Sequence, residues 1–390
     1  MSDVPSDSGF GLANLPYGVF STAESTPRVG VRYGDRVLDL VAALGDPVFD
    51  NPTLNPFMAL GRAAWEESRT HVRDLLTAEP DHPALIALSD VTLHLPIEVP
   101  DYVDFYASEH HASNVGRIFR PDAEPLLPNW KHMPVSYHGR ASTVVVSGTD
   151  IVRPNGQRKA PDAEAPTFGP CQRLDVEVEL GFVVGVGADL GTPVSGADFA
   201  EHVFGAVLLN DWSARDIQAW EYVPLGPHLG KSFATSISPW VVPLAALEEA
   251  RTSTPPRTHG LLPYLRDGED WALEIDLELD VNGAVLSRPP YSGMYYSGAQ
   301  MLAHLTVNGA RLNTGDLYGS GTVSGEQPDQ RGSLLELSWG GKEPITMPDG
   351  STRTFLEDGD VATIRGSFAG AGGQRCSFGE VTGAILPANR

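Results

Sequence analysis

Cysteine is nearly absent from this sequence, and long apolar runs are absent altogether. The 390 residues include two cysteines, Cys171 and Cys376, which are too few for a disulfide framework or a zinc cluster and which suit a reducing compartment. No apolar run approaches the ~18 residues that a membrane helix needs. The first ten residues are acidic and polar, unlike a signal peptide. We therefore expect a soluble, cytoplasmic protein with no membrane partner.

Several catalytic motifs are missing as well. The chain has no G-x-S-x-G, so a nucleophile elbow of the α/β-hydrolase type is not expected. It has no HExxH, and Gly185, Gly187 and Gly191 miss the spacing of a dinucleotide-binding fingerprint. The run from Gly226 to Ser232 has three residues between its glycines, where a phosphate-binding loop has four, and it carries proline where that loop needs backbone N–H groups. We reject a phosphate-binding loop here.

The charge balance is strongly acidic. Fifty acidic residues against 27 basic ones give a formal net charge of −23, and the pI is near 4.7. This balance argues against nucleic acid and against anionic membranes as partners. An anionic substrate would be repelled by the molecule as a whole, so its site would need local cations or a metal ion.

Apolar patterning predicts a mainly β protein with some α-helix. Residues 273–287 alternate around Asn282-Gly283, which is a strong hairpin signal, and residues 29–40 predict a second hairpin. Parallel βαβ alternation is absent. Residues 153–171 are expected to be a Pro/Gly-rich connection, and residues 332–341 short strands and turns. A proline-punctuated stretch at residues 89–100 places a domain boundary near residue 97.

Besides a helix after Ser213, which is described below, three helices are predicted, one of them in detail. Asn55 is expected as the N-cap of the first helix, with Pro56 at its first helical position. The apolar residues that fit its buried face are Phe57, Leu60, Ala64, Trp65, Val72 and Leu75. Residues 101–120 are expected to start extended and then turn helical, and residues 297–305 are expected to be helical.

Residues 210–222 combine a strand end with a polar helix. Asp211 follows an apolar, strand-like run at residues 203–209. Ser213 and its neighbour three residues on, Asp216, predict a helix that begins with a capping box. On that helix one face carries the side chains of Arg215, Gln218 and Tyr222.

Lys231 is the next unusual feature. It is one of four lysines in the chain, and no other full charge lies between residues 221 and 248. Its apolar, Gly/Pro-rich surroundings indicate a positioned cation. A solvated surface lysine is the alternative.

Two acidic residues alternate on a predicted strand in the run LDVEVELGFVVG. Glu177 and Glu179 are two apart, so both point to one face, where Asp104 and Asp211 could join them. Carboxylates that converge in this way need a divalent cation, and all-oxygen ligands favour Ca²⁺ or Mg²⁺. A solvated strand face is the alternative. Periodicity does not separate this run from a second one with the same alternation, Glu274, Asp276, Glu278 and Asp280.

His111 is a candidate general base, because the ordinary pKa of histidine lies close to neutral pH. It follows Asp104 and Tyr106 at short distance. The chain has ten other histidines, and His138 is a comparable candidate on local grounds. The Pro- and aromatic-rich residues 120–141 are expected to line a site.

Five runs stand out in this order along the chain: DYVDFYASEHHASNVGRIFR, LLPNWKHMPVSYHGRAS, RLDVEVELGFVVG, NDWSARDIQAWEYVPLGPHLGKSF and GSLLELSW. Together they resemble the fumarylacetoacetate hydrolase family over residues 97–390, and the resemblance extends more weakly over the first domain. It implies a small N-terminal SH3-like barrel at residues 1–97 and a large C-terminal catalytic domain of mixed β-sandwich rolls at residues 98–390. It also implies a homodimer.

The resemblance assigns the candidate site residues. The implied ligands of a Ca²⁺ or Mg²⁺ ion are Asp104, Glu177, Glu179 and Asp211. The implied base is His111, oriented by Glu336. The implied substrate-binding residues are Tyr106, Arg120, Tyr137, Arg215, Gln218, Tyr222, Lys231 and Thr322, of which Arg215, Gln218 and Lys231 surround the reacting oxyanion. A second cation position matches Lys231 and Thr235, although Ala234 stands where the family pattern has glycine.

The implied activity is metal-dependent hydrolysis of a carbon–carbon bond. The expected substrate is a small diketo acid, 4-fumarylacetoacetate, which would give fumarate and acetoacetate in the last step of tyrosine and phenylalanine breakdown. Two alternatives stay open from the sequence. One is a hydrolase of the same superfamily that acts on acylpyruvates such as fumarylpyruvate, and the other is a non-catalytic metal-binding scaffold.

Overall fold

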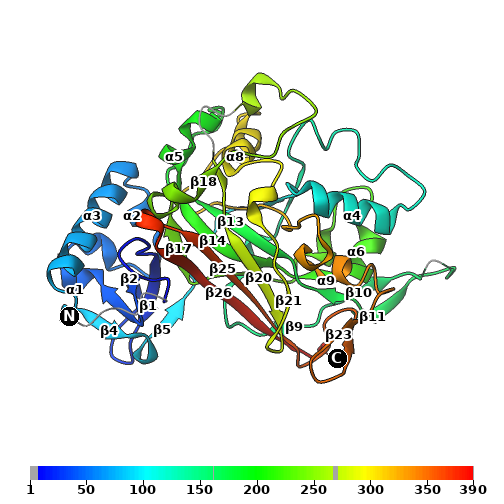
Figure 1. The fold of residues 1–390 in the computed structure, drawn as a ribbon, viewed down its shortest axis with the longest axis horizontal. Helices are drawn as coiled ribbons and strands as arrows, with labels where there is room; N and C mark the ends of the chain where they lie inside the picture. Colours follow the sequence, from blue (N-terminus) through cyan, green and yellow to red (C-terminus); the bar gives the residue numbers. More distant parts are fainter. Residues whose placement is uncertain (1–7, 161, 267–270, 390) are drawn as a thin grey trace.

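One mixed sheet dominates the computed structural model, which describes residues 8–160, 162–266 and 271–389 (Figure 1). Thirteen strands of these described ranges form it, so the fold is mainly β, as predicted. In spatial order its strands are β4 (Leu85–Ala87), β3 (Arg36–Asp39), β2 (Arg28–Tyr33), β1 (Tyr17–Ser21), β17 (Trp240–Pro243), β14 (Val203–Asp211), β13 (Val178–Val184), β22 (Leu317–Gly319), β6 (Tyr102–Phe105) and β7 (Ser136–His138), with β5 (Thr92–His94), β16 (Thr235–Ile237) and β8 (Val144–Val146) attached beside this path.

A five-stranded second sheet packs against the first. Its two longest strands cross the middle of the molecule and lie against β14 (Figure 1). Leu208 of the first sheet and Leu277 and Phe378 of the second belong to one buried core, which joins the two layers. In spatial order the second sheet consists of β21 (Ala284–Ser287), β20 (Asp276–Val281), β25 (Val361–Ala369), β26 (Arg375–Leu386) and β9 (Ile151–Val152).

Short helices and small strand pairs surround the two sheets. The helices are α1 (Leu40–Leu44), α2 (Asn55–Met58), α3 (Arg62–Ala78), α4 (Glu109–Phe119), α5 (Phe199–His202), α6 (Arg215–Glu221), α7 (Leu244–Leu247), α8 (Gly298–Thr306) and α9 (Leu334–Leu337). The pairs are β10 (Asn155–Arg158) with β11 (Thr167–Pro170), β12 (Leu174–Asp175) with β15 (Ser213–Ala214), β18 (Arg251–Thr252) with β19 (Ala272–Leu273), and β23 (Ile345–Thr346) with β24 (Thr352–Arg353). Within the described ranges, no helix has both the length and the apolar character of a membrane span.

The N-terminal strands continue the large sheet. Strand β1 pairs with β17, whose residues lie more than 200 positions away. Tyr17 and Phe57 of the N-terminal segment pack against Phe204 of β14 with ring centroids 5.5 Å and 5.9 Å apart. The segment therefore shares a hydrophobic core with the rest of the chain. The boundary near residue 97 and the SH3-like barrel stay predictions.

The helix predicted from Asn55 is wrong in its detail. It is divided into α2 and α3 because Gly61 adopts a φ of +88°, which L-residues rarely tolerate. Asn55 lies inside α2, and its amide bonds the backbone of Glu98 instead of capping the helix. Leu60, at the break, is 57% exposed, and the buried residue near the end of α3 is Leu76 instead of Leu75.

Three further local predictions are wrong. Residues 332–341 contain the helix α9 instead of only strands and turns. The expected connection at residues 153–171 includes the hairpin of β10 and β11. Helix α6 has no capping box, because Ser213 lies in strand β15 and Asp216 instead accepts hydrogen bonds from Cys171 Sγ and the backbone N–H of Gln172. The predicted hairpins at residues 29–40 and 273–287 and the predicted helices in α4 and α8 are confirmed.

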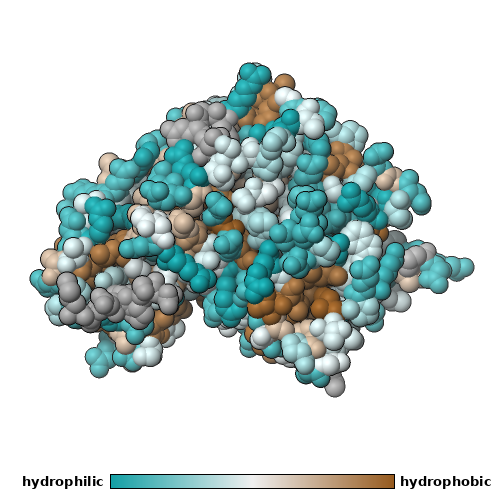
Figure 2. All heavy atoms as spheres, in the orientation of Figure 1, coloured by the Kyte–Doolittle hydropathy of each residue, from teal (hydrophilic) through white to brown (hydrophobic). Residues whose placement is uncertain are grey.

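The visible surface is largely hydrophilic. Figure 2 shows one face on which hydrophobic residues gather in separate patches between broad hydrophilic areas. This distribution agrees with the strongly acidic composition of the chain.

Candidate functional site

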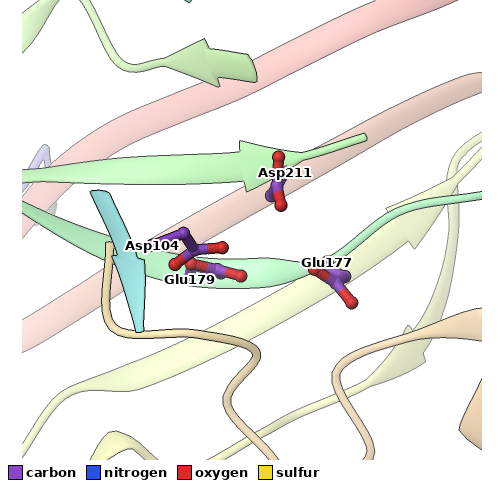
Figure 3. A group of neighbouring side chains, drawn as sticks. All are labelled: Asp104, Glu177, Glu179 and Asp211. Carbon is purple, nitrogen blue, oxygen red and sulfur yellow. The ribbon is translucent and has the colours of Figure 1, made fainter. Parts of the chain in front are cut away.

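Four carboxylates converge on the part of the large sheet formed by β14, β13, β22 and β6. Asp104 lies on β6, Glu179 on β13 and Asp211 at the end of β14, while Glu177 immediately precedes β13. One ligand atom from each of the four residues lies within 4.8 Å of the others, and Figure 3 shows the side chains around a common space. All four are buried, with at most 4% of each exposed. The structure thus brings together the four residues that the sequence grouped.

The electrostatics of this cluster fit a bound cation. Burial raises the pKa of Asp104 and of Glu179 well above the ordinary range, and the neighbouring carboxylates raise it further. The backbone N–H of Gly321 donates to both of these side chains at 3.1 Å. Among the described residues, Glu179 Oε1 finds no hydrogen-bond partner although it is buried. Carboxylate oxygens that lie close together, one of them without a hydrogen-bond partner, are the ligands that a hard divalent cation such as Ca²⁺ or Mg²⁺ prefers.

Lys231 lies beside this cluster and is only 5% exposed, so the alternative of a solvated lysine is wrong. Its Nζ forms ion pairs with Glu177 and with Asp211 Oδ2, the latter at 2.7 Å. Burial would lower the pKa of Lys231, but the two carboxylates raise it overall. Asp211 also accepts hydrogen bonds from Tyr137 at 2.5 Å and from Thr235 at 3.1 Å. Lys231 therefore supplies a fixed positive charge next to the carboxylates.

The second acidic run has a different environment. Glu274 and Asp276 are exposed, and Glu278 is half-buried and pairs with two arginines. Asp280 is buried, but it accepts the Gly283 N–H at 2.8 Å and so closes the hairpin turn. The two runs share a period and differ in burial, which is decided by the strands packed around them.

His111 forms a pair with Glu336. Its Nδ1 lies 2.7 Å from Glu336 Oε2, and its Nε2 lies 3.9 Å from Glu177 Oε1. Glu336 also accepts hydrogen bonds from three donors at 2.9 Å, namely Asn114, Ser324 and Ser333. Burial would raise the pKa of Glu336, but His111, Asn114 and Ser324 lower it overall. An ionised Glu336 keeps a proton on Nδ1 and leaves Nε2 of His111 as the free acceptor.

The other histidine candidate lies elsewhere. His138 is exposed on β7 and is not among the residues that line the cavity described next. The N-cap Ser108 accepts the backbone N–H of His111 at 3.3 Å and so fixes this residue in the first turn of α4. The structure therefore distinguishes two histidines that were equivalent on local grounds.

A cavity of about 370 Å³ opens over the carboxylates and His111. Among the predicted site residues, Asp211, Thr235 and Glu336 lie outside its lining. Asp211 and Glu336 contact the lining residues Lys231 and His111, and Thr235 contacts Asp211. The predicted residues in the lining are Asp104, Tyr106, His111, Arg120, Tyr137, Glu177, Glu179, Arg215, Gln218, Tyr222, Lys231 and Thr322.

Cationic and unpartnered groups face this cavity. Arg215 is held by Asp175 at 2.8 Å, by Glu177 at 2.7 Å and by Gln218 at 3.1 Å. Burial would lower the pKa of Arg215, but the two carboxylates raise it overall. Within the described parts of the chain, the buried atoms of lining residues without a hydrogen-bond partner also include Arg120 Nε and Thr322 Oγ1. The cavity thus offers hydrogen-bond donors to an anionic ligand.

The sequence predicted part of the apolar wall of the cavity and missed the rest of it, together with one buried acid. The stretch at residues 120–141 was expected to line a site, and Pro125, Leu126 and Trp130 do so. The lining residue Phe119 lies on α4 and carried no separate signal. Asp175 was missed entirely, although it alternates with Glu177 in the acidic run and could have been singled out on that ground.

The mixed-β fold and the pocket together define a protein with an acidic, metal-type centre beside a histidine–glutamate pair. The sequence model described as "Fumarylacetoacetate (FAA) hydrolase C-terminal" matches residues 102–379, and "Fumarylacetoacetase N-terminal" matches residues 13–96. The chain belongs to the fumarylacetoacetate hydrolase family.

Individual relatives agree with this assignment. The chain is 47% identical to fumarylacetoacetase of Homo sapiens over 416 aligned positions, which cover 100% of this chain and 99% of the relative. It is 48% identical to fumarylacetoacetase of Caenorhabditis elegans over 414 positions, which cover 99% and 98%. A solved structure of fumarylacetoacetate hydrolase from psychrophilic Exiguobacterium antarcticum covers 96% of this chain and 100% of its own, with a TM-score of 0.57 at 19% identity, and shares the fold.

Proposed function

We propose that this chain hydrolyses the carbon–carbon bond of 4-fumarylacetoacetate to give fumarate and acetoacetate. Relatives named fumarylacetoacetase, 46–48% identical over almost their whole length, support this substrate. The observation that carries the proposal is the approach of His111 Nε2 to within 3.9 Å of Glu177, inside a cavity that also exposes cationic groups. A base, a metal-type centre and anion-binding donors therefore share one space.

His111 acts as the general base. Glu336 holds Nδ1 at 2.7 Å, so Nε2 is free to take a proton from water. The resulting hydroxide attacks the ketone carbonyl of the fumaroyl group itself, and the bond from this carbon to the acetoacetate carbon then breaks with its electron pair on the acetoacetate carbon. The proton on Nε2 balances the reaction by passing to the leaving enolate. General-base catalysis of this kind contributes about 10²- to 10⁴-fold in rate.

Fixed donors stabilise the tetrahedral oxyanion. Arg215, Gln218 and Lys231 line one cavity, and Arg215 and Lys231 are held by carboxylates that limit their motion. Donors fixed before the reaction lower the barrier because they need no reorganisation as charge develops. A divalent cation held by Asp104, Glu177, Glu179 and Asp211 would supply Lewis-acid stabilisation of the diketone oxygens.

The substrate carboxylates bind to the remaining polar groups. Arg120 Nε and Thr322 Oγ1 have no hydrogen-bond partner among the described residues, and Tyr106, Tyr137 and Tyr222 line the same cavity. Arginine can bind a carboxylate bidentately. These groups counter the net charge of −23, which would otherwise repel a dianionic substrate.

Several finer points belong to the same proposal. We infer a homodimer with an SH3-like domain at residues 1–97 and a catalytic domain at residues 98–390, acting in tyrosine and phenylalanine breakdown in the cytoplasm without nucleic-acid or membrane partners. The two free cysteines support a reducing compartment. We infer Ca²⁺ or Mg²⁺ as the ion because the ligands are all oxygens. A second cation position at Lys231 and Thr235 is supported by the contacts of both residues with Asp211.

A substrate panel tests the proposal. The metal-loaded protein should cleave fumarylacetoacetate to fumarate and acetoacetate, measured as product formation, faster than it cleaves fumarylpyruvate. Much faster cleavage of fumarylpyruvate would make the chain an acylpyruvate hydrolase. Metal binding without cleavage of either compound would favour the scaffold alternative.

A further inference from the structure

Asp175 is a buried acid that links two parts of the site. It is 0% exposed and, in the described part of the chain, lies outside the cavity lining, so it does not touch the substrate. Its Oδ2 accepts the Nε–H of Arg215 at 2.8 Å and the backbone N–H of Leu335 at 3.0 Å. Its Oδ1 accepts the backbone N–H groups of Leu334 at 2.7 Å and of Val176 at 2.8 Å.

Every acceptor position of this carboxylate is used. An ionised carboxylate has about four acceptor sites, and Asp175 meets four donors. An asparagine has the same shape but would turn an NH₂ group toward two of these donors. The site therefore requires a carboxylate.

The donors come from two catalytic elements. Arg215 begins α6 and reaches into the cavity, whereas the N–H groups of Leu334 and Leu335 open α9, the helix that carries Glu336. A negative charge at the first turn of a helix stabilises it. Glu336 follows Leu335 directly and holds His111, so the position of α9 sets the position of the base.

We propose that Asp175 is a positioning residue that fixes Arg215 and the His111–Glu336 pair relative to each other. The inference rests on the proposed function, because it concerns the geometry of that reaction. Asp175 keeps Arg215, the oxyanion donor, and His111, the base, at a fixed distance from each other. The substrate must fit between these two residues as the transition state forms.

Steady-state kinetics of the metal-loaded full chain test this role. Asp175→Asn should lower kcat by about 10²-fold, comparable to the loss of one fixed oxyanion donor, with little change in KM. A positioning effect through Arg215 should also be non-additive, so the same substitution should cost less in an Arg215→Ala background. A wild-type kcat, or an equal loss in both backgrounds, would overturn the proposal.

A matched control separates positioning from folding. Asp360 is also buried and also bonds an arginine, Arg353, and a backbone N–H, that of Glu357. Asp360 lies outside the cavity lining, so Asp360→Asn should lower the melting temperature while kcat stays unchanged.

A second variant covers the case in which Asp175→Asn does not fold. Asp175→Glu keeps the charge and the acceptors but moves them by one methylene, and it should still lower kcat by at least about tenfold. Wild-type kcat in this variant would contradict the proposal. Failure of the wild-type protein to cleave fumarylacetoacetate would instead refute the proposed function, so the two failures are distinguishable.

Discussion

His111 Nδ1 lies 2.7 Å from Glu336 Oε2, although 225 positions separate the two residues in the chain. The contact joins the first turn of α4 to the short helix α9. Because Glu336 also accepts three other side-chain hydrogen bonds, the imidazole is held by a carboxylate that cannot easily turn away. This arrangement directs Nε2 toward the carboxylate cluster.

Glu336→Gln should lower kcat severely while the protein remains folded. A glutamine is not an anion and can present its NH₂ group to His111, which favours the wrong tautomer. Replacement of the orienting acid by its amide in a comparable triad costs about 10⁴-fold, and we expect a loss of about 10²- to 10⁴-fold here. Glu326→Gln, on an exposed residue nearby in the chain, should leave kcat unchanged. Equal kcat values for the two variants would exclude Glu336 as the orienting residue.

Metal affinity should distinguish the two acidic runs. Glu179→Gln should weaken Mg²⁺ or Ca²⁺ binding by more than about tenfold, because even changes outside the ligand shell cost 10- to 100-fold. Glu274→Gln should leave affinity unchanged, because Glu274 is exposed on the other run. Titration calorimetry measures both. A large loss of metal affinity in Glu274→Gln would show that the ion binds at the run containing Glu274 and not at the cluster containing Glu179.

Arg120→Ala should raise KM more than it lowers kcat. Arg120 lines the cavity with an Nε that has no hydrogen-bond partner among the described residues, and we propose that it binds a substrate carboxylate. Loss of such a charged contact typically costs about 2 kcal/mol or more, which corresponds to a KM increase of tenfold or more. Arg140→Ala, on an exposed arginine outside the lining, is the control. An unchanged KM for fumarylacetoacetate in Arg120→Ala would remove this residue from the binding site.

Asp316 should make stability depend on pH. Burial raises the pKa of Asp316 to about 6 in the folded protein, above its unfolded value of about 3.9. The folded state therefore holds a proton that the unfolded state has released, and this contribution to stability is lost as the pH rises from about 4 to 6. The shift corresponds to at most about 3 kcal/mol.

Asp316→Asn cannot ionise and should lose this part of the pH dependence. Urea unfolding of both proteins at pH 4.5 and at pH 7 measures it, since the other titrating groups are common to the two chains. The change in unfolding free energy from pH 4.5 to pH 7 should be more positive in Asp316→Asn than in the wild-type protein. Identical differences would show that Asp316 does not titrate in this range.

The sequence predicted those hairpins and helices whose pattern of apolar residues and turn residues lies within one short stretch of the chain. Hairpins such as the one at Asn282-Gly283 depend on alternation and on a turn with positive φ, and both are local properties. Helix α9 was missed because four residues are too few for a helical period. The break at Gly61 was missed because a single glycine does not specify its own φ.

The site was less accessible to local reasoning than the strands. Glu177 and Glu274 stand in runs with the same alternation, but Glu177 is buried beside β13, which β14 and β22 flank, whereas Glu274 is exposed. The candidate residues were grouped through the family resemblance, which spacing alone could not replace. Asp175 had no assignment from either source, because its partners at residues 215 and 334–335 meet it only in the folded chain.

The most direct measurement is kcat for fumarylacetoacetate in His111→Ala, on a sample whose metal affinity is known. Removal of the general base should lower kcat by about 10²- to 10⁴-fold, while Mg²⁺ or Ca²⁺ binds with the wild-type affinity, because His111 is not one of the four carboxylates. Wild-type turnover by His111→Ala would contradict the account.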